Sequence, residues 1–159
     1  MNLCPELRRL QAEHARWLAA LGPVEHEGRA ARLLALWEEE ILPHCRREEE
    51  VLLPELASRI AEADAVIVFT LGDHLALRRL ARELRAAAPT AVRELVAALE
   101  EKLAEHLAFE ERTLFPALQE ELGCDRLAAL GAELANHDGG RRGAKEPSPA
   151  RPRRKEPPP

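Results

Sequence analysis

The stretch HCRREEEVLLPEL, residues 44–56, recurs in similar form as HLAFEERTLFPAL, residues 106–118. Each copy reads His, three residues, Glu-Glu, and then an apolar pair followed by Pro. Histidine and glutamate four residues apart lie on the same face of a helix, one turn removed. The repeat therefore predicts two helices that each direct an imidazole and a carboxylate toward one point, His44 with Glu48 and His106 with Glu110.

A second repeat lies upstream of each copy. His14 opens HARWLAAL and His74 opens HLALRRL, so each half of the chain pairs a lone histidine with a His/Glu helix. An imidazole is a one-point ligand, whereas a carboxylate can bridge two metals, and together they predict a paired metal site with open positions. Nitrogen and oxygen ligands without thiolate favour iron, with manganese or zinc also compatible. The candidate metal ligands are His14, His44, Glu48, His74, His106 and Glu110.

Burial gives a second argument for metal. A lone histidine on an apolar face is more often an ordinary hydrogen-bonded core residue. Carboxylates on inner helix faces, however, are costly to bury without a cation, and both Glu48 and Glu110 are expected there. The next residues, Glu49 and Glu111, are expected at the surface or supporting a ligand. Cys45 is expected to be structural, with a redox or outer role at the site as the alternative.

Composition predicts one helical domain. The chain has 159 residues, 46% of them hydrophobic and 3% aromatic, with no Tyr. Three cysteines without CxxC spacing indicate neither a disulfide framework nor a thiolate zinc site, so a reducing cytosol is expected. No basic segment followed by an apolar run opens the sequence, and no apolar stretch is long enough for a membrane span. We therefore expect a soluble cytoplasmic protein.

Apolar periodicity predicts four long helices and a short fifth. The predicted helices cover about 5–21, 29–52, 61–87, 91–122 and 125–136, with a kink or break at Pro43 and an interruption at Pro54. A buried strand over 65–71 is the alternative, which we reject because its flanks are strongly helical. Short connections then favour an all-α, up-down-up-down antiparallel four-helix bundle over residues 1–138.

Residues 139–159 differ in composition from the rest. They hold seven basic and two acidic residues and are rich in Pro, so we expect a disordered, solvated tail. Contact of the tail with nucleic acid, an anionic partner or its own acidic bundle stays open. The acidic domain lacks a basic surface interleaved with aromatics, which argues against nucleic-acid binding.

The pattern of the six candidate metal ligands resembles the hemerythrin-like, HHE cation-binding family over residues 5 to about 120. The resemblance implies an antiparallel four-helix bundle that holds a non-haem di-iron centre. It also implies that Glu48 and Glu110 bridge two iron ions while the four histidines are terminal ligands. Members of the family bind dioxygen, sense oxygen or iron, or handle nitric oxide and peroxide.

The sequence departs from the hemerythrin pattern at three places. Hemerythrins proper have a second histidine four residues from the third-helix histidine, whereas Arg78 follows His74 and Thr70 precedes it. One iron is thus short of a ligand, which favours reactivity over oxygen carriage. Cys45 and Leu107 stand where some relatives carry an extra Glu. Nitrosative-repair relatives carry a paired-Cys extension in front of the bundle, and because this sequence opens close to the first helix, their specialised role is not expected.

Two classes of function fit these features. The first is a protein that binds or senses dioxygen, nitric oxide, peroxide or iron itself. The second is a di-iron enzyme that reduces peroxide or nitric oxide in stress defence. The lack of Tyr and of a general acid beyond the ligands favours binding. A metal-free structural bundle is a third class, and no particular oligomeric state is predicted.

Overall fold

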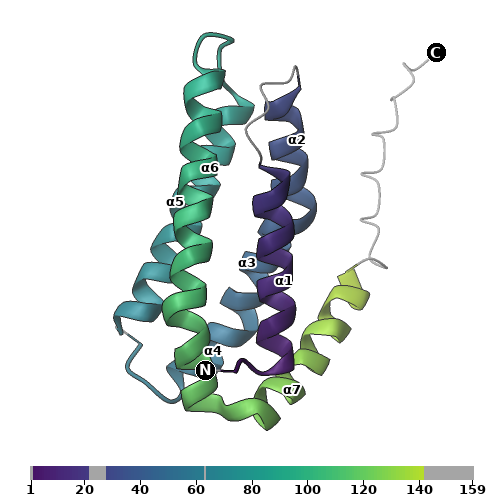
Figure 1. Cartoon of the computed structure of the whole chain (residues 1–159), viewed down its shortest axis with the longest axis vertical. Helices are drawn as coiled ribbons and strands as arrows, with labels where there is room; N and C mark the ends of the chain where they lie inside the picture. The colour runs from purple at the N-terminus through teal and green to yellow at the C-terminus, as the bar shows by residue number, and fades with distance from the viewer. Residues whose placement is uncertain (1, 22–27, 63, 142–159) are drawn as a thin grey trace, which may run out of the picture.

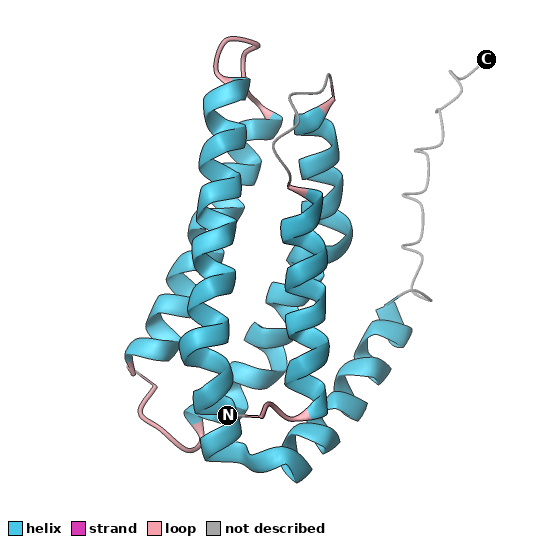
Figure 2. Ribbon diagram, viewed as in Figure 1, coloured by secondary structure: helices cyan, strands magenta, loops and turns pink. Residues whose placement is uncertain are grey.

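The computed structural model describes residues 2–21, 28–62 and 64–141. These residues form helices and turns without any strand (Figure 2). With η denoting a π-helical segment, the elements are α1 (Pro5–Ala20), α2 (Arg29–Leu36), η1 (Trp37–Ile41), α3 (Leu42–Arg47), η2 (Glu48–Leu52), α4 (Leu53–Ala57), α5 (Ala65–Arg85), α6 (Val92–Phe109), η3 (Glu110–Leu114) and α7 (Phe115–Arg141). The predicted all-α class is confirmed, and the rejected strand over 65–71 is the first part of α5.

The helices associate as four long rods (Figure 1). The rods are α1, the run from α2 to α4, α5, and the run from α6 into the first part of α7. Their buried apolar residues form two separate clusters. One cluster contains Leu7, Leu56, Phe115 and Leu118, and the other contains Trp17, Leu77, Leu99 and Leu103. Between these clusters lies a layer of buried polar side chains.

Each π-helical segment lies just before a proline. Pro43, Pro54 and Pro116 each follow the last residue of a π segment by two positions. A proline ring crowds the carbonyl four residues back and offers no backbone donor, and a wider π turn accommodates that conflict without breaking the helix. The expected kink or break at Pro43 is thus a local π turn in a continuous rod. Glu48 and Glu110 are the first residues of η2 and η3.

The bounds of α5 and the end of α7 differ from the prediction. The third long helix is shorter than predicted, because Asp64 caps α5 by accepting a hydrogen bond from the backbone N–H of Val66 at 3.0 Å. Gly123 ends the fourth rod, as predicted, with φ 71° and ψ 164° inside α7. The last helix continues to Arg141, past its predicted end at about Asn136. The start of a disordered tail at residue 139 stays a prediction. The rest of the predicted tail, 142–159, lies outside the described residues.

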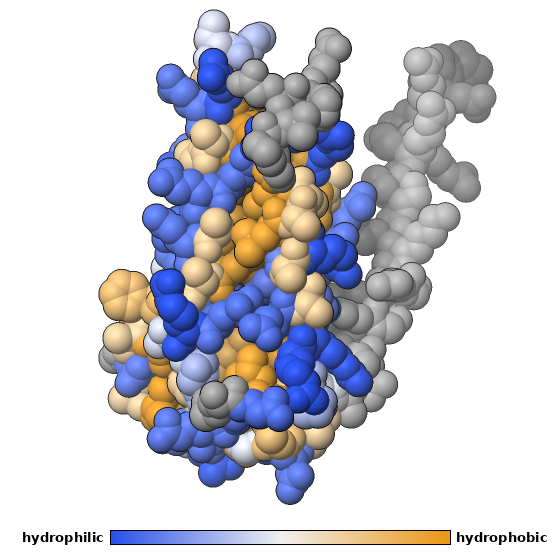
Figure 3. Space-filling view, in the orientation of Figure 1, coloured by the Kyte–Doolittle hydropathy of each residue, from blue (hydrophilic) through white to orange (hydrophobic). Residues whose placement is uncertain are grey.

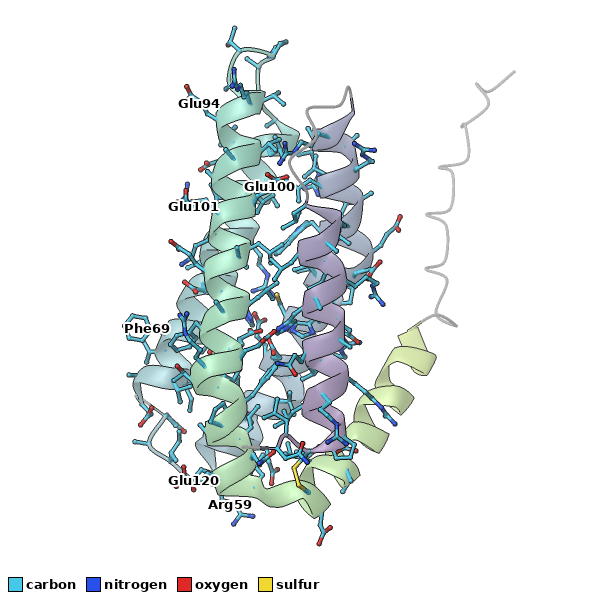
Figure 4. The ribbon with its side chains drawn as sticks, in the orientation of Figure 1. Arg59, Phe69, Glu94, Glu100, Glu101 and Glu120 are labelled. Atoms are coloured by element: carbon cyan, nitrogen blue, oxygen red, sulfur yellow. A yellow bond between two sulfur atoms is a disulfide. The ribbon has the colours of Figure 1, made fainter. Side chains whose placement is uncertain are left out.

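A disulfide joins Cys4 to Cys124, 120 residues apart. The yellow bond at the lower end of the bundle in Figure 4 marks it. The prediction of no disulfide framework was wrong, because these two cysteines flank α1 and the Gly123 bend at the same end of the bundle. This removes one argument for a reducing compartment, and the cytoplasmic location stays a prediction. No helix among the described residues is long and apolar enough to span a bilayer.

Polar side chains cover much of the face that Figure 3 shows. On this face the apolar residues form a seam between charged flanks. A few large apolar side chains are exposed, most of them on α5: Leu18, Val68, Phe69, Leu71 and Leu75.

Candidate metal centre

All six residues that the repeat singles out lie together in the polar layer between the apolar clusters. Each is at most 1% exposed. They come from all four rods: His14 from α1, His44 from α3, Glu48 from η2, His74 from α5, His106 from α6 and Glu110 from η3. Figure 4 shows nitrogen- and oxygen-bearing side chains gathered between the rods partway along the bundle.

The four imidazoles form two pairs. In the first pair, His14 and His44, the Nε2 atoms lie 3.3 Å apart. In the second pair, His74 and His106, the ring centroids lie 4.8 Å apart with the rings nearly perpendicular. Each pair therefore joins a lone histidine to the His/Glu histidine of the same half of the chain.

Glu110 presents one carboxylate oxygen to each histidine pair. Its Oε2 lies 3.2 Å from His14 Nε2 and 3.7 Å from His44 Nε2. Its Oε1 lies 2.8 Å from His106 Nε2 and 3.7 Å from His74 Nε2. A carboxylate in this position can join two metal ions, with one oxygen on each.

Glu48 has the same arrangement with fewer contacts. Its Oε1 lies 3.3 Å from Nε2 of His44, and its Oε2 lies 3.2 Å from Nε2 of His74. Two ligands that bind one metal at about 2.1 Å and at right angles are about 3 Å apart. Most of the nitrogen–oxygen distances here are close to that separation.

Several buried polar atoms of the site have no hydrogen-bond partner among the described residues. They include both oxygens of Glu48 and Glu110, Nε2 of His74 and both ring nitrogens of His106. Buried polar groups are nearly always satisfied, so a cluster of this kind needs a missing partner. A cation between the carboxylates and imidazoles would satisfy these oxygens and the Nε2 atoms.

The first pair supports the same conclusion. His14 Nδ1 lies 3.1 Å from Glu111 Oε1, and His44 Nδ1 lies 3.2 Å from Glu13 Oε2. If each Nδ1 carries the hydrogen donated to its carboxylate, the two Nε2 lone pairs face each other without a hydrogen between them. A metal ion can accept both lone pairs, and the donor set of the site fits such an ion.

A ring of acidic residues supports the histidines from outside. Besides Glu111 and Glu13, Glu49 lies 2.7 Å from Nδ1 of His74, whereas the nearest oxygen of Asp73 is 3.7 Å from Nδ1 of His106. A carboxylate on the second ring nitrogen fixes the tautomer and orientation of a metal-binding imidazole. Glu49 and Glu111 are partly exposed and contact histidines of the site, so a supporting role for them stays a prediction that these contacts fit. Glu13 and Asp73 were not predicted from the sequence, although each directly precedes a lone histidine.

Basic side chains hold this outer ring in turn. Arg47 donates to Glu13 at 2.7 Å, and Arg78 donates to both oxygens of Glu49 at 2.7 and 2.9 Å. Burial raises the pKa of Glu49, but the hydrogen bonds from Arg78 and the charge of His74 outweigh burial and hold that pKa below its ordinary value. Glu49 is therefore ionised and ready to accept from the Nδ1–H group of His74.

Without a cation, protons concentrate in the site. Burial lowers the pKa of His44 and His106, but the neighbouring charges of Glu48 and Glu110 more than offset it, so both pKa values are raised. The pKa of His74 is also raised, because its polar interactions with the nearby Cys45, Glu110 and Glu48 outweigh burial. The pKa of Glu110 is lowered by its histidine neighbours despite burial. The pocket therefore favours positive charge.

The two pairs have different walls. Trp17 packs edge-on to His44 with ring centroids 5.0 Å apart, and Phe115 stacks on His14 at 5.4 Å. The thiol of Cys45 lies instead beside the second pair, in a group with His74 and His106. Burial raises the pKa of this thiol, but the polar interaction with the neighbouring imidazoles of His106 and His74 outweighs burial and leaves that pKa below its ordinary value.

A helical bundle with a buried layer of histidine and glutamate could hold metal, and comparison with known families shows which class of bundle this is. Residues 4–138 match the hemerythrin HHE cation-binding domain. The match covers most of the chain, and the protein belongs to this family. No curated protein and no solved structure gave a significant match. Membership supports cation binding by the buried histidine and glutamate clusters.

Proposed function

We propose that this chain is a non-haem di-iron-binding protein that binds or senses dioxygen or a related small molecule, nitric oxide or peroxide, or iron itself. The observation that carries the proposal is the placement of Glu48 and Glu110. Each is fully buried and presents one oxygen to each histidine pair. Membership in a cation-binding family supports it independently.

The residues divide between two metal positions. His14 and His44 would hold one ion together with Glu48 Oε1 and Glu110 Oε2. His74 and His106 would hold the other with the remaining oxygen of each carboxylate. Nitrogen and oxygen ligands suit iron and are compatible with zinc or manganese. Bound iron would supply electron transfer and open positions for a small molecule.

The surrounding side chains would hold the ligands ready and keep the site dry. Glu111, Glu13 and Glu49 accept hydrogen bonds from Nδ1 of the imidazoles, which would orient the Nε2 atoms toward the metal and make them better ligands. Trp17 and Phe115 exclude water around the first pair. Glu111 also lines a surface hollow formed mainly by α1, with Arg8, Gln11, Ala12, Ala15 and Leu18. This hollow would bring a small molecule to the outer side of His14.

Two further observations bear on the finer points. Besides the six candidate ligands, the described part of the chain has one buried polar side chain, Thr70, whose hydroxyl donates to the Val66 carbonyl at 2.8 Å. The lack of a spare buried acid favours binding over turnover. The rods are proposed to run up-down-up-down, because the apolar cluster that each rod meets first alternates from rod to rod.

Metal content and absorption spectra test the proposal. The protein would be purified without chelator, reduced without oxygen, and exposed in turn to dioxygen, nitric oxide and peroxide. We expect bound iron and an oxygen-dependent charge-transfer band that reverses on degassing. Peroxide or nitric oxide consumption that saturates with substrate would instead favour the enzyme. Absence of iron binding would overturn the proposal.

Glu110→Gln tests whether such spectra come from this site. Glutamine has nearly the shape of glutamate but carries no charge, so the variant should lose the band. Glu120→Gln is the matched control, because Glu120 is exposed on the same rod (Figure 4). A band that survives Glu110→Gln would place the metal elsewhere.

A further inference from the structure

We propose that Cys45 is a thiolate ligand of the metal ion held by His74 and His106. The inference rests on the proposed function, because it adds a ligand to one of its two metal positions. Cys45 directly follows His44 on α3, yet it is grouped with the histidines of the other pair. Consecutive helical residues point about 100° apart, so neighbours in sequence can serve different metals.

The positions of the ligand atoms support a shared ion. The Cys45 sulfur and one ring nitrogen each of His74 and His106 all lie within 4.8 Å of one another. Sulfur at about 2.3 Å and nitrogen at about 2.1 Å from one metal are separated by about 3 to 4.4 Å. Cys45 is fully buried, and so are both histidines. Small adjustments of side chains are therefore enough to bring the three atoms onto one ion.

Unsatisfied nitrogens of the second pair are an independent sign of a ligand here. His74 Nε2 and both ring nitrogens of His106 have no hydrogen-bond partner among the described residues. Both side chains are buried and lie beside the thiol. A metal ion would satisfy a nitrogen on each ring and the sulfur together.

No side chain of α5 supplies a third terminal ligand. Arg78, one turn after His74, has its guanidinium on the two oxygens of Glu49. Thr70, one turn before His74, donates its hydroxyl to its own helix. Cys45 reaches the same pair from the neighbouring rod and can take the position that α5 leaves unfilled.

Cys45 has a free thiol, and this thiol lies beside the second histidine pair only. Cys4 and Cys124 form the disulfide, so Cys45 is the free cysteine. The equivalent residue of the second half, directly after His106, is Leu107. The first pair therefore receives no matching thiolate. On binding, the S–H bond is exchanged for a sulfur–metal bond and the proton leaves to solvent.

Cobalt(II) titration of the metal-free, oxidised protein tests the assignment. Cobalt reports bound imidazole and carboxylate through visible bands and thiolate through a near-ultraviolet charge-transfer band. We expect the charge-transfer band to form in the natural chain and to vanish in Cys45→Ser. The affinity for the ion at the second pair should fall by roughly 10–100-fold in the variant, at least as much as loss of a supporting group costs.

Two controls separate the possible outcomes. The Cys4→Ser/Cys124→Ser double variant retains Cys45 and should keep the charge-transfer band. Cys45→Ala should lose it with unchanged helix content by circular dichroism. Visible bands without any thiolate band in the natural chain would overturn the role of Cys45 and leave the metal site standing. No cobalt bands at all would overturn the proposed function itself.

Discussion

The two halves of the chain contribute the same pattern of histidines and acidic residues to the site, but different side chains surround the two histidine pairs. In each half an acidic residue directly precedes the lone histidine, Glu13 in the first half and Asp73 in the second. A second glutamate directly follows the buried glutamate, Glu49 in the first half and Glu111 in the second. In each half the acid before the lone histidine lies beside the paired histidine, and the trailing glutamate binds a histidine of the other half. The halves are therefore interlocked, and neither forms its supports alone.

The walls differ where the repeat does. Trp17 occupies the position three residues after His14, whereas Leu77 occupies it after His74. Cys45 follows one paired histidine and Leu107 the other. The first pair is consequently lined by aromatic rings, and the second by a thiol. Because the same residues recur with different neighbours, the two proposed metal positions would have unequal tasks.

The largest expected effect comes from removing Glu110. Its oxygens lie within 3.7 Å of all four imidazoles, whereas Glu48 approaches only His44 and His74. Glu110→Ala should release both metals, with a loss beyond the roughly 100-fold that a supporting group costs, and Glu48→Ala should cost less. Metal per chain after dialysis measures both variants. Equal losses would show that the carboxylates are equivalent.

Lowering the pH should reduce the stability of the metal-loaded protein and raise that of the metal-free protein. Since His44, His74 and His106 have raised pKa values, metal must displace protons, and affinity should fall about tenfold per pH unit for each proton displaced. In metal-free protein these imidazolium groups stabilise the fold below about pH 6.5, and the contribution is lost as pH rises through the raised values. Melting temperatures against pH measure both trends. Parallel trends would argue against metal at these histidines.

The Cys4–Cys124 disulfide is not part of the repeated pattern. It should contribute to the free energy of unfolding without changing the metal content. Cys4→Ser/Cys124→Ser should lower the free energy of unfolding by about 2–5 kcal/mol, because the closed loop is long. Urea unfolding of the metal-free protein measures the loss. Metal content should be unchanged, and a parallel loss of metal would mean that this end of the bundle supports the site.

Replacing a buried His/Glu pair by leucines should not harm metal-free protein. His106→Leu/Glu110→Leu removes two buried polar groups, so stability should be unchanged or higher by up to about 4 kcal/mol. His44→Leu/Glu48→Leu is the matched change in the first half. Urea unfolding compares the two. A loss of stability in only one half would show that its polar contacts contribute to the fold without metal.

The smallest effect should distinguish the two acids that precede the lone histidines. Glu13 is within hydrogen-bond distance of His44 at 3.2 Å, whereas Asp73 is 3.7 Å from His106. Glu13→Gln should therefore weaken metal binding by roughly 10–100-fold, and Asp73→Asn by less than about tenfold. Competition with a chelator measures both affinities. The reverse order would show that Asp73 moves onto His106 when metal binds.

The cluster of candidate ligands could be predicted from the sequence because histidine and glutamate recur at one spacing. Two His/Glu helices and two lone histidines were enough to select six residues that meet in one layer. The outer acids were also within reach, since Glu13 and Asp73 stand beside the predicted ligands. The π turns follow the prolines, but an α-helical pattern alone does not distinguish a π turn from a kink.

Long-range contacts could not be predicted in this way. Cys4 and Cys124 are 120 residues apart, and cysteine pairing does not follow from spacing. Cys45 lies next to His44 in sequence but beside His74 and His106 in space, because its direction depends on how the rods are rotated against one another. Rod rotation is set by packing of the two apolar clusters rather than by any local pattern.

The disulfide also has a mechanical consequence. Every residue of the metal centre lies between Cys4 and Cys124, so the sulfur–sulfur bond closes a covalent ring around the site. Tension applied at the two chain ends passes through that bond and bypasses the bundle. Reduction would place the same load on the helices between these cysteines. Pulling on the chain ends should therefore unfold the bundle more easily in the reduced protein than in the oxidised one.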